Sequence, residues 1–258
     1  MPALADLHVH LLAGLDDGPD TEDVAVAMCR MLVSEGAAHA TALAHQNPDY
    51  HTNTPARMLA SATALAATLA AKGVPLTVYP TAEVMLLPTL VADWDAGRLL
   101  SVGDHKKWLL VEMPHDEFVD VLPLAEALRS RGVRLIIAHA ERYPELLFDH
   151  AVAAQWIAAG CLMQLTARAI AEPWFDEMER GIEAWVRGGF VHLLGSDGHG
   201  IDRRQPLLAA GYRRLRKLAG RSTAARIGSE WGLAILRGES VTVPPPHPPT
   251  RRWFGRWF

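Results

Sequence analysis

The chain contains 258 residues, half of which are hydrophobic, and its formal net charge is −4. This length is sufficient for one large core, and a single α/β barrel uses about 250 residues. The negative net charge argues against nucleic acid as a partner, and the presence of only two cysteines, Cys29 and Cys161, excludes a disulfide framework. No basic leader opens the sequence and no segment approaches the roughly 20 apolar residues of a membrane span, so we expect a cytoplasmic protein.

Short apolar runs alternate with longer amphipathic segments along the whole sequence. We expect strands at 4–9, 40–44, 76–81, 108–111, 133–138, 161–165 and 190–194. We expect helices at about 20–36, 55–72, 119–131, in a segment ending near 159, and at 175–187, 205–219 and 223–236. Such alternation is typical of a parallel sheet, and seven repeats indicate a closed or nearly closed α/β barrel. An open doubly wound sheet is the alternative.

Two pairs of metal-binding residue types follow apolar runs. The first run ends in His8-Val9-His10, and the seventh ends in Asp197-Gly198-His199. In an extended strand residues i and i+2 point to the same side, so each pair can converge on one ion. A single His-x-His is more often packed than metal-bound, but two such pairs predict two walls of one metal site.

Most of the other apolar runs also end at a side chain that can bind a metal. The candidate ligands are His8, His10, the Asp16-Asp17 pair, His45, Glu83, Glu112, His139, Asp197 and His199. Because the carboxyl ends of parallel strands lie on one face, we expect these side chains to gather there. Imidazole and carboxylate ligands without thiolates suit Mn²⁺, Fe or Zn²⁺, and their number implies two or three ions, which is typical of phosphoester hydrolysis.

Arginines accompany the candidate ligands. Arg142 lies three residues after His139, and Arg203 and Arg204 follow His199 by four and five residues. Guanidinium groups match the geometry of phosphate oxygens, so these residues are candidates for substrate binding. Arginines that only solvate a loop are the alternative, and this reading suits Arg203 better than the other two.

Six stretches of the sequence carry a family resemblance. They are DLHVHLLAGLDDGPDT, the Ala-His after the second strand, AEV, VEMP, AHAERY and GSDGH. They resemble the motifs of the polymerase-and-histidinol-phosphatase (PHP) superfamily, and HLLAGLDDGP and AHAERY resemble the bacterial metal-dependent protein-tyrosine phosphatases encoded with capsule and exopolysaccharide genes. The resemblance spans about residues 4 to 237 and implies a distorted (β/α)7 TIM-like barrel, the PHP fold, with a trinuclear metal centre.

Matched position by position, the resemblance implies three ligand sets. The first would contain His8, His10, Glu83 and Asp197, the second would share Glu83 and add Glu112 and His139, and the third would contain Asp17, His45 and His199. Mn²⁺ is the expected metal, with Fe or Zn²⁺ as alternatives, in two to three ions. Asp17 rather than Asp16 matches the second acid of the family motif, so Asp16 is expected to have a supporting role.

The resemblance also implies catalytic roles. Arg142 and Arg204 match the two phosphate-binding arginines of the family. In the mechanism that we expect from this site, Asp197 or a histidine at the rim assists departure of the phenolate. Two positions depart from the family pattern, because Gln46 stands where a second histidine is usual and Ala140 stands where proline is usual. Neither change removes a ligand, and both bear on the substrate more than on the metals.

The expected function is therefore that of a metal-dependent phosphomonoester hydrolase acting on phosphotyrosine. The resemblance implies that the substrate is the tail of a bacterial tyrosine kinase that regulates capsule or exopolysaccharide production. One alternative is a small-molecule phosphatase of the histidinol-phosphatase type. The other is a non-catalytic interaction module that is stabilised by metals.

The end of the sequence differs in composition from the rest. We expect a phosphatase domain at 1–240, followed at 241–258 by a proline-rich linker and a tail in which three arginines lie among four aromatic residues. Such a tail can lie at an anionic membrane surface or contact another subunit of a homo-oligomer, and a disordered terminus without a partner is an equal alternative. We expect a cytoplasmic protein, with peripheral membrane contact through this tail as one of these alternatives.

Overall fold

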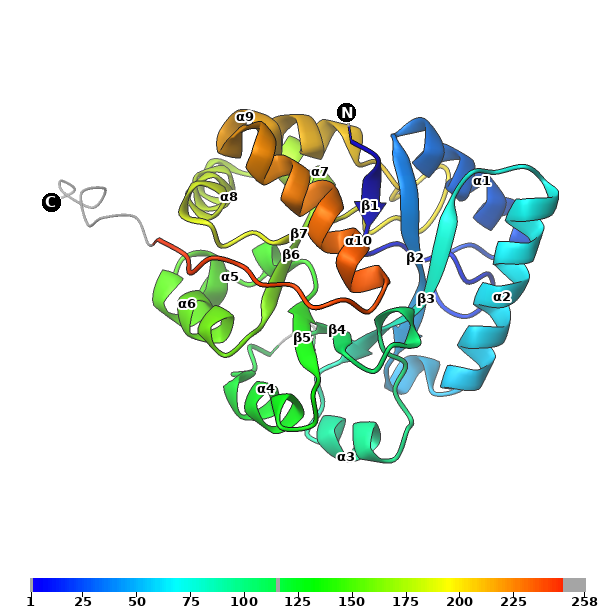
Figure 1. The fold of residues 1–258 in the computed structure, drawn as a ribbon, viewed down its shortest axis with the longest axis horizontal. Helices are drawn as coiled ribbons and strands as arrows, with labels where there is room; N and C mark the ends of the chain where they lie inside the picture. Colours follow the sequence, from blue (N-terminus) through cyan, green and yellow to red (C-terminus); the bar gives the residue numbers. More distant parts are fainter. Residues whose placement is uncertain (1, 115–116, 248–258) are drawn as a thin grey trace, which may run out of the picture.

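Seven parallel strands form the centre of the structure and lie side by side in sequence order (Figure 1). The computed structural model describes residues 2–114 and 117–247. The strands are β1 (Leu4–Asp6), β2 (Ala37–Gln46), β3 (Thr77–Met85), β4 (Trp108–Glu112), β5 (Arg134–Ile137), β6 (Leu162–Thr166) and β7 (Leu193–Gly195). All seven expected strands are present, although β2 and β3 extend further toward their carboxyl ends than the sequence indicated.

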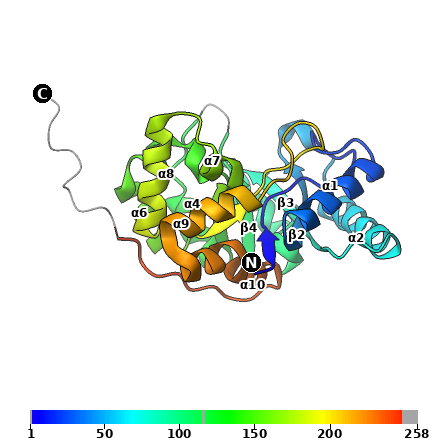
Figure 2. The same ribbon diagram turned by 90° about the horizontal axis from the view of Figure 1, so that it is seen from above.

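Most helices surround the strands on the outside of the sheet (Figure 2), whereas the last one lies across the amino-terminal end of the barrel. The helices are α1 (Glu22–Ser34), α2 (Pro55–Ala71), α3 (Leu90–Asp95), α4 (Leu122–Arg129), α5 (Pro144–Leu147), α6 (His150–Ala158), α7 (Ala167–Ala171), α8 (Asp176–Gly188), α9 (Ala209–Ala225) and α10 (Trp231–Leu236). The expected starts of α1 and α2 are confirmed, because the side chains of Thr21 and Thr54 accept hydrogen bonds from the backbone of Val24 and Arg57.

The sheet closes almost completely into a barrel. Beyond the end of β1, the backbone N–H of Leu7 donates to the carbonyl of Leu194 at 3.2 Å, and Val9 pairs with Gly198. These contacts join the first strand to the last, as a TIM-like (β/α)7 barrel requires. The expected barrel is therefore confirmed, and the open doubly wound alternative is wrong.

Two apolar cores lie on the two sides of the barrel wall. In β5, Leu135 and Ile137 belong to the core between the strands and the outer helices, whereas Ile136 belongs to the core inside the barrel. This alternation follows from the period of two in a strand. The inner core also contains Leu236 of α10 and Val241. Residues near the end of the described chain therefore fill the amino-terminal end of the barrel.

The last helical region agrees with the expectation of two helices separated near residue 220. After α9 the chain continues through one π-helical turn, Arg226–Glu230, directly into α10. The break lies at Gly220, whose φ of 81° and ψ of 169° are outside the helical range. Glycine tolerates this conformation because it has no Cβ. The expected break between 219 and 223 is therefore present, whereas the π-helical turn was not predicted from the sequence.

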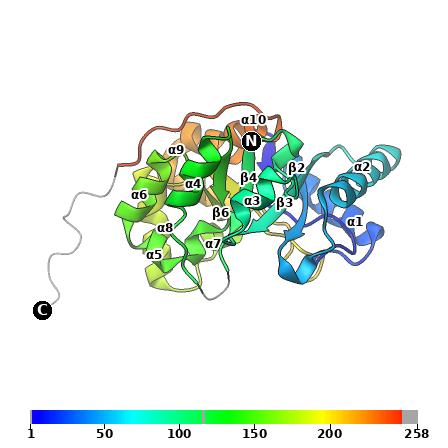
Figure 3. The ribbon, with the colours of Figure 1, turned by 90° about the horizontal axis from the view of Figure 1, so that it is seen from below.

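The segment after α10 crosses the amino-terminal end of the barrel (Figure 3). Arg134 at the start of β5 donates from Nη1 to the carbonyl of Val241 at 3.1 Å, and the N–H of His247 donates to the carbonyl of Gly188 at 2.7 Å. The basic and aromatic tail, residues 248–258, lies outside the described residues. Within the described chain, no helix has the length and apolarity needed to cross a membrane.

Candidate metal centre

All nine ligands expected from the sequence meet at the carboxyl end of the barrel. The pairing of β2 with β3 places His45 beside Glu83, and the pairing of β3 with β4 places Glu112 beside Met85. The nine residues belong to four overlapping groups of potential ligand atoms, and within each group these atoms lie within 4.8 Å of one another. Parallel register and the shared direction of the strands therefore bring distant parts of the sequence together.

The first set lies deepest in the barrel. Nε2 of His8 is 3.1 Å from Oε2 of Glu83 and 3.4 Å from Oδ1 of Asp197. Nε2 of His10 is 3.2 Å from the same oxygen of Glu83. All four side chains are almost completely buried. Two imidazoles and two carboxylates thus point at one small volume.

Glu83 also faces the second set. While its Oε2 lies beside the two histidines of the first set, its Oε1 is 3.1 Å from Nε2 of His139. The same His139 nitrogen is 3.9 Å from Oε2 of Glu112. The two oxygens of one carboxylate therefore face different groups of ligands, which is the arrangement required of a bridging ligand.

The third set lies nearer the mouth of the barrel. Oδ1 of Asp17 is 3.5 Å from Nε2 of His45 and 3.4 Å from Nε2 of His199. The other ring nitrogen of His45 is 3.1 Å from Oε1 of Glu112, so His45 lies between the second and third sets. The Asp17 side chain is 45 % exposed, unlike the deeper ligands. This set can therefore be reached from solvent.

Several buried atoms that face the centre have no hydrogen-bond partner among the described residues. They are Nε2 of His8, His10 and His199, Nδ1 of His45, and Oε1 of Glu112. Some lie close to carboxylate oxygens, but without the angles of a hydrogen bond, and orphaned buried polar atoms cost free energy. Convergent lone pairs of this kind are satisfied by divalent cations. The residues present therefore fit a metal centre.

The outer ring nitrogens of two histidines fix the direction of these lone pairs. Nδ1 of His8 lies 3.1 Å from Oε1 of Gln164, and Nδ1 of His10 lies 2.7 Å from Oδ2 of Asp16. An amide oxygen and a carboxylate oxygen only accept, so each Nδ1 carries the hydrogen. When a cation replaces the proton on Nε2, each Nε2 presents its lone pair to the centre, as in most histidine ligands of metals.

Five carboxylates give the centre a strongly negative potential. They belong to Asp16, Asp17, Glu83, Glu112 and Asp197, and two guanidinium groups oppose them. Although burial lowers the pKa of His10, Asp16 and Glu83 outweigh it and raise the pKa to about 9. Burial likewise lowers the pKa of His45, but Asp17 and Glu112 raise it to about 11. A site that favours positive charge this strongly attracts cations.

The two predicted arginines both contact Asp197. Nη2 of Arg142 donates to Oδ2 of Asp197, and Arg204 donates to the same carboxylate and, from Nη1, to Asp17 at 3.3 Å. Burial would raise the pKa of Asp197, but the charges of His8 and Arg142 hold it well below its usual range. Asp197 is therefore a carboxylate at neutral pH. It orients the two guanidinium groups at the mouth of the site.

A cleft of about 330 Å³ opens above the ligands. One of its walls consists of residues that the sequence did not predict to belong to the site. Asn47, Asp49 and Tyr50 line it from the 3₁₀ turn after β2, Pro48–Tyr50. The Tyr50 ring stacks on His45 with 5.6 Å between centroids and 6° between planes. The Asn-Pro-Asp sequence signals a turn, and Asn47 caps it by accepting from the N–H groups of Asp49 and Tyr50.

Gln46, where the family pattern has histidine, does not contribute to the third set. Its Nε2 donates to the carbonyls of Asn53 at 2.8 Å and Arg98 at 3.1 Å, and its Oε1 accepts from Leu100 N–H at 2.9 Å. The side chain therefore holds neighbouring loops together. The replacement of histidine at this position leaves the ligands themselves in place.

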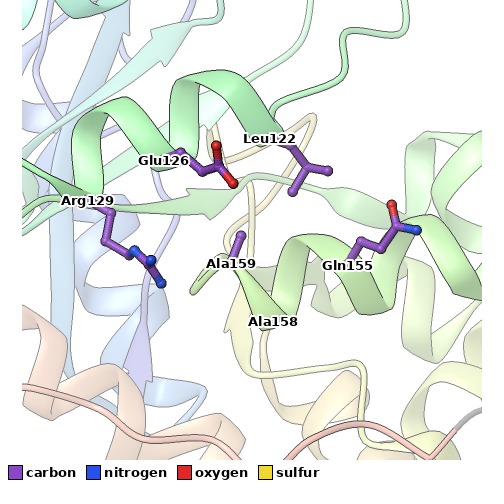
Figure 4. A pocket seen from close by; sticks show the side chains of 6 residues that line it. All are labelled: Leu122, Glu126, Arg129, Gln155, Ala158 and Ala159. Carbon is purple, nitrogen blue, oxygen red and sulfur yellow. The ribbon is translucent and has the colours of Figure 1, made fainter.

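A second hollow of about 340 Å³ lies between α4 and α6, away from the ligands (Figure 4). Its lining consists of Leu122, Glu126, Arg129, Gln155, Ala158 and Ala159. One acid and one base on a small apolar surface do not form a converging set of ligand atoms. The cleft at the carboxyl end of the barrel is therefore the candidate functional site.

The chain is similar to known proteins over most of its length. Residues 4–237 match the family model described as capsular polysaccharide synthesis, CpsB/CapC. The tyrosine-protein phosphatase YwqE of Bacillus subtilis is 26% identical over 250 residues, covering 96% of this chain and 98% of that protein. The tyrosine-protein phosphatase CpsB of Streptococcus pneumoniae is 22% identical, covering 87% and 94%.

A solved structure gives the same result in three dimensions. It belongs to a study of YwqE from B. subtilis and CpsB from S. pneumoniae, described as unique metal-dependent tyrosine phosphatases. The TM-score is 0.88 at 26% identity, with 96% of this chain and 100% of the other covered. The fold is therefore shared over almost the whole of both chains.

Proposed function

The chain belongs to the CpsB/CapC family of capsular polysaccharide synthesis, and on that premise we propose that it is a metal-dependent protein-tyrosine phosphatase. One observation carries the proposal. Buried histidine nitrogens and carboxylate oxygens converge without hydrogen-bond partners, directly beneath two arginines that share Asp197. Metal ligands and phosphate-binding groups therefore occur in one cleft.

The proposed cofactor is Mn²⁺, bound as up to three ions. His8, His10, Glu83 and Asp197 would hold the first, Glu83, Glu112 and His139 the second, and Asp17, His45 and His199 the third. Bound divalent ions supply Lewis-acid activation of water and of the phosphoryl group. Mixed imidazole and carboxylate ligands suit Mn²⁺, and Fe or Zn²⁺ would satisfy the same donors.

Arg142 and Arg204 bind the phosphoryl oxygens in this proposal. Their guanidinium groups are oriented by Asp197, whose low pKa keeps it ionised and able to accept. An arginine already held by a carboxylate loses little conformational freedom when it binds phosphate. Asp197 holds no proton at neutral pH, so its part in catalysis is to orient the two guanidinium groups. The leaving phenolate takes its proton from water.

Tyr50 supports an aromatic substrate. Its ring lines the cleft and stacks on His45 at the mouth. A phenyl ring entering the cleft would meet an aromatic wall there, whereas an alkyl phosphate would not gain the same contact. The proposed substrate is therefore phosphotyrosine, on the tail of a bacterial tyrosine kinase that controls capsule or exopolysaccharide production.

The test compares two substrates of the Mn²⁺-loaded protein. We expect phosphate release from a phosphotyrosine peptide to exceed release from histidinol phosphate, and His139→Ala to abolish both. A much faster rate on histidinol phosphate would replace this proposal with a small-molecule phosphatase. Stoichiometric metal binding without turnover of either ester would indicate a non-catalytic, metal-stabilised module.

We also propose peripheral membrane contact beside the phosphatase domain at 1–240. The α9 helix exposes Arg213, Arg216 and Lys217, which form no ion pair within 2–114 and 117–247. The backbone N–H of the last described residue, His247, donates a hydrogen bond to the carbonyl of Gly188 at the end of the neighbouring α8. The arginines and aromatics of the tail sequence follow from there. Basic side chains close to aromatics suit an anionic membrane surface.

A further inference from the structure

Gln164 of β6 contacts ligands from two different sets. Its Oε1 accepts from Nδ1 of His8 at 3.1 Å and from the backbone N–H of His139 at 2.9 Å. The residue is completely buried. One amide oxygen therefore holds the ring of a first-set ligand and the backbone of a second-set ligand.

Asp16 repeats this pattern on the other side of the centre. Its Oδ2 accepts from Nδ1 of His10 at 2.7 Å and from the backbone N–H of His45 at 2.9 Å. Its Oδ1 accepts from Gly18 N–H at 3.0 Å, which fixes the carboxylate plane, and the side chain is buried. This oxygen therefore connects the first set to the third.

The histidines that donate these hydrogen bonds depend on them for their position. His139 has φ 33° and ψ 50°, in the left-handed region that a residue with a Cβ seldom adopts. It lies beyond the end of β5, so regular pairing within the sheet does not hold it in place. Such a conformation persists only when its surroundings enforce it, and the bond to Gln164 contributes to that enforcement.

We propose that Gln164 and Asp16 are positioning residues that couple the three ligand sets, so that the ions bind cooperatively. When Nε2 of a histidine binds a cation, its Nδ1–H becomes a stronger donor and tightens the bond to the shared oxygen. The same oxygen accepts from the backbone N–H of a ligand in the next set, His139 or His45, and so fixes the position of that ligand. Coupling of this kind acts equally in both directions. The inference rests on the proposed metal centre, but not on the substrate.

The experiment is a Mn²⁺ titration of chelator-stripped protein, with bound ions counted by elemental analysis. The wild type is expected to bind with a Hill coefficient above 1. Gln164→Leu should weaken the two steps that involve His8 and His139 by about 10- to 100-fold and leave the step of the third set within about threefold. Asp16→Leu should weaken the steps that involve His10 and His45 instead.

Tyr143 provides a matched control, because among the described residues its hydroxyl is hydrogen-bonded to the side chain of one ligand, His139. Its hydroxyl is 3.3 Å from Nδ1 of His139 and accepts from Met113 N–H. Tyr143→Phe should therefore weaken one binding step and leave the Hill coefficient unchanged. If Tyr143→Phe weakened two steps as Gln164→Leu does, the coupling would run through the shared Glu83, and the proposal would be wrong.

Two further measurements separate positioning from simple loss of structure. Nitrogen NMR of the Zn²⁺-loaded protein should show His8 with its hydrogen on Nδ1 in the wild type, and mixed between the two nitrogens in Gln164→Leu. Gln164→Glu keeps an acceptor oxygen and should restore both the tautomer and the cooperativity. Independent, non-cooperative binding by the wild type, or by a folded Gln164→Glu, overturns the proposal. Because neither readout requires turnover, failure of the phosphatase assay alone would contradict only the proposed function.

Discussion

Nη2 of Arg204 donates to both carboxylate oxygens of Asp197, at 2.9 and 3.0 Å. The carboxylate is 5 % exposed, whereas the arginine side chain is 45 % exposed, so the pair reaches from the buried ligands to the mouth of the cleft. The arginine is therefore held over the candidate metal centre with its remaining N–H groups available to a substrate.

This relationship predicts that Arg204 acts on turnover and not on folding. Arg204→Ala should lower kcat/KM for a phosphotyrosine peptide by about 10²- to 10³-fold, the cost of removing one preorganised donor. Because the side chain is half exposed, thermal stability and metal content should change little. The neighbouring exposed Arg203→Ala is the control and should retain activity. Equal losses in both variants would show that the loop, not the guanidinium group, matters.

Removal of metal should destabilise the protein. Five carboxylates face the centre, and without cations they repel one another in a buried site. At a free Mn²⁺ concentration 100 times the dissociation constant, binding to the folded state adds about 2.7 kcal/mol to the free energy of unfolding. Calorimetry with EDTA and with Mn²⁺ measures this difference. His10→Ala should shrink it, and an identical shift in that variant would place the stabilising ions elsewhere.

Neither cysteine should take part in the reaction. Burial raises the pKa of both thiols, Cys29 and Cys161, to about 12, so neither forms a nucleophilic thiolate at neutral pH. Cys29→Ala together with Cys161→Ala should keep kcat on a phosphotyrosine peptide within about twofold, with some loss of stability from the core. Loss of turnover in a variant that still folds and binds Mn²⁺ would refute the metal-dependent mechanism.

His192 should make the fold sensitive to acid. It is completely buried, and this burial lowers its pKa to about 3, while in the unfolded chain the value is near 6.5. Between these values the unfolded state binds the extra proton, so its contribution to stability is present above about pH 6.5 and is lost as the pH falls toward 3. The loss by pH 4.5 is about 3 kcal/mol.

His192→Asn isolates this effect. Nδ1 of His192 accepts from Met163 N–H at 3.0 Å, and the amide oxygen of asparagine can take over this role without titrating. Urea unfolding in EDTA at pH 4.5 and pH 7 should show a smaller difference for the variant than for the wild type. The same difference in both proteins would assign the acid sensitivity to other groups.

The exposed basic residues of α9, Arg213, Arg216 and Lys217, should bind anionic membranes together with the tail. In sedimentation with vesicles, the wild type should bind those containing anionic lipid and not those of neutral lipid alone, with binding lost at high salt. Arg213→Glu with Lys217→Glu, or deletion of 248–258, should abolish binding. Arg30→Glu with Arg57→Glu, an equal charge change on the exposed faces of α1 and α2, is the control. No binding by the wild type would exclude this contact, and retained binding by the deletion variant would exclude the tail.

Much of the site could be read from the sequence, because its pattern is local. His8-Val9-His10 and Asp197-Gly198-His199 each follow an apolar run, and strand geometry fixes which side chains point the same way. Strand ends in a parallel barrel share one face, so the presence of a common site followed from the alternation alone. The family motifs then divided the ligands among three sets, and the distances around Glu83 are consistent with that division.

The tertiary structure alone decided how the ligands are held. Gln164 is a polar residue between Met163 and Leu165 in the otherwise apolar run of β6. Nothing nearby in the sequence shows that its side chain faces His8. Asp16 had only a supporting role in the sequence reading, although it contacts both His10 and His45. Ligand types and strand ends are determined by local sequence, whereas a shared hydrogen bond depends on distances between segments that only the closed barrel brings together.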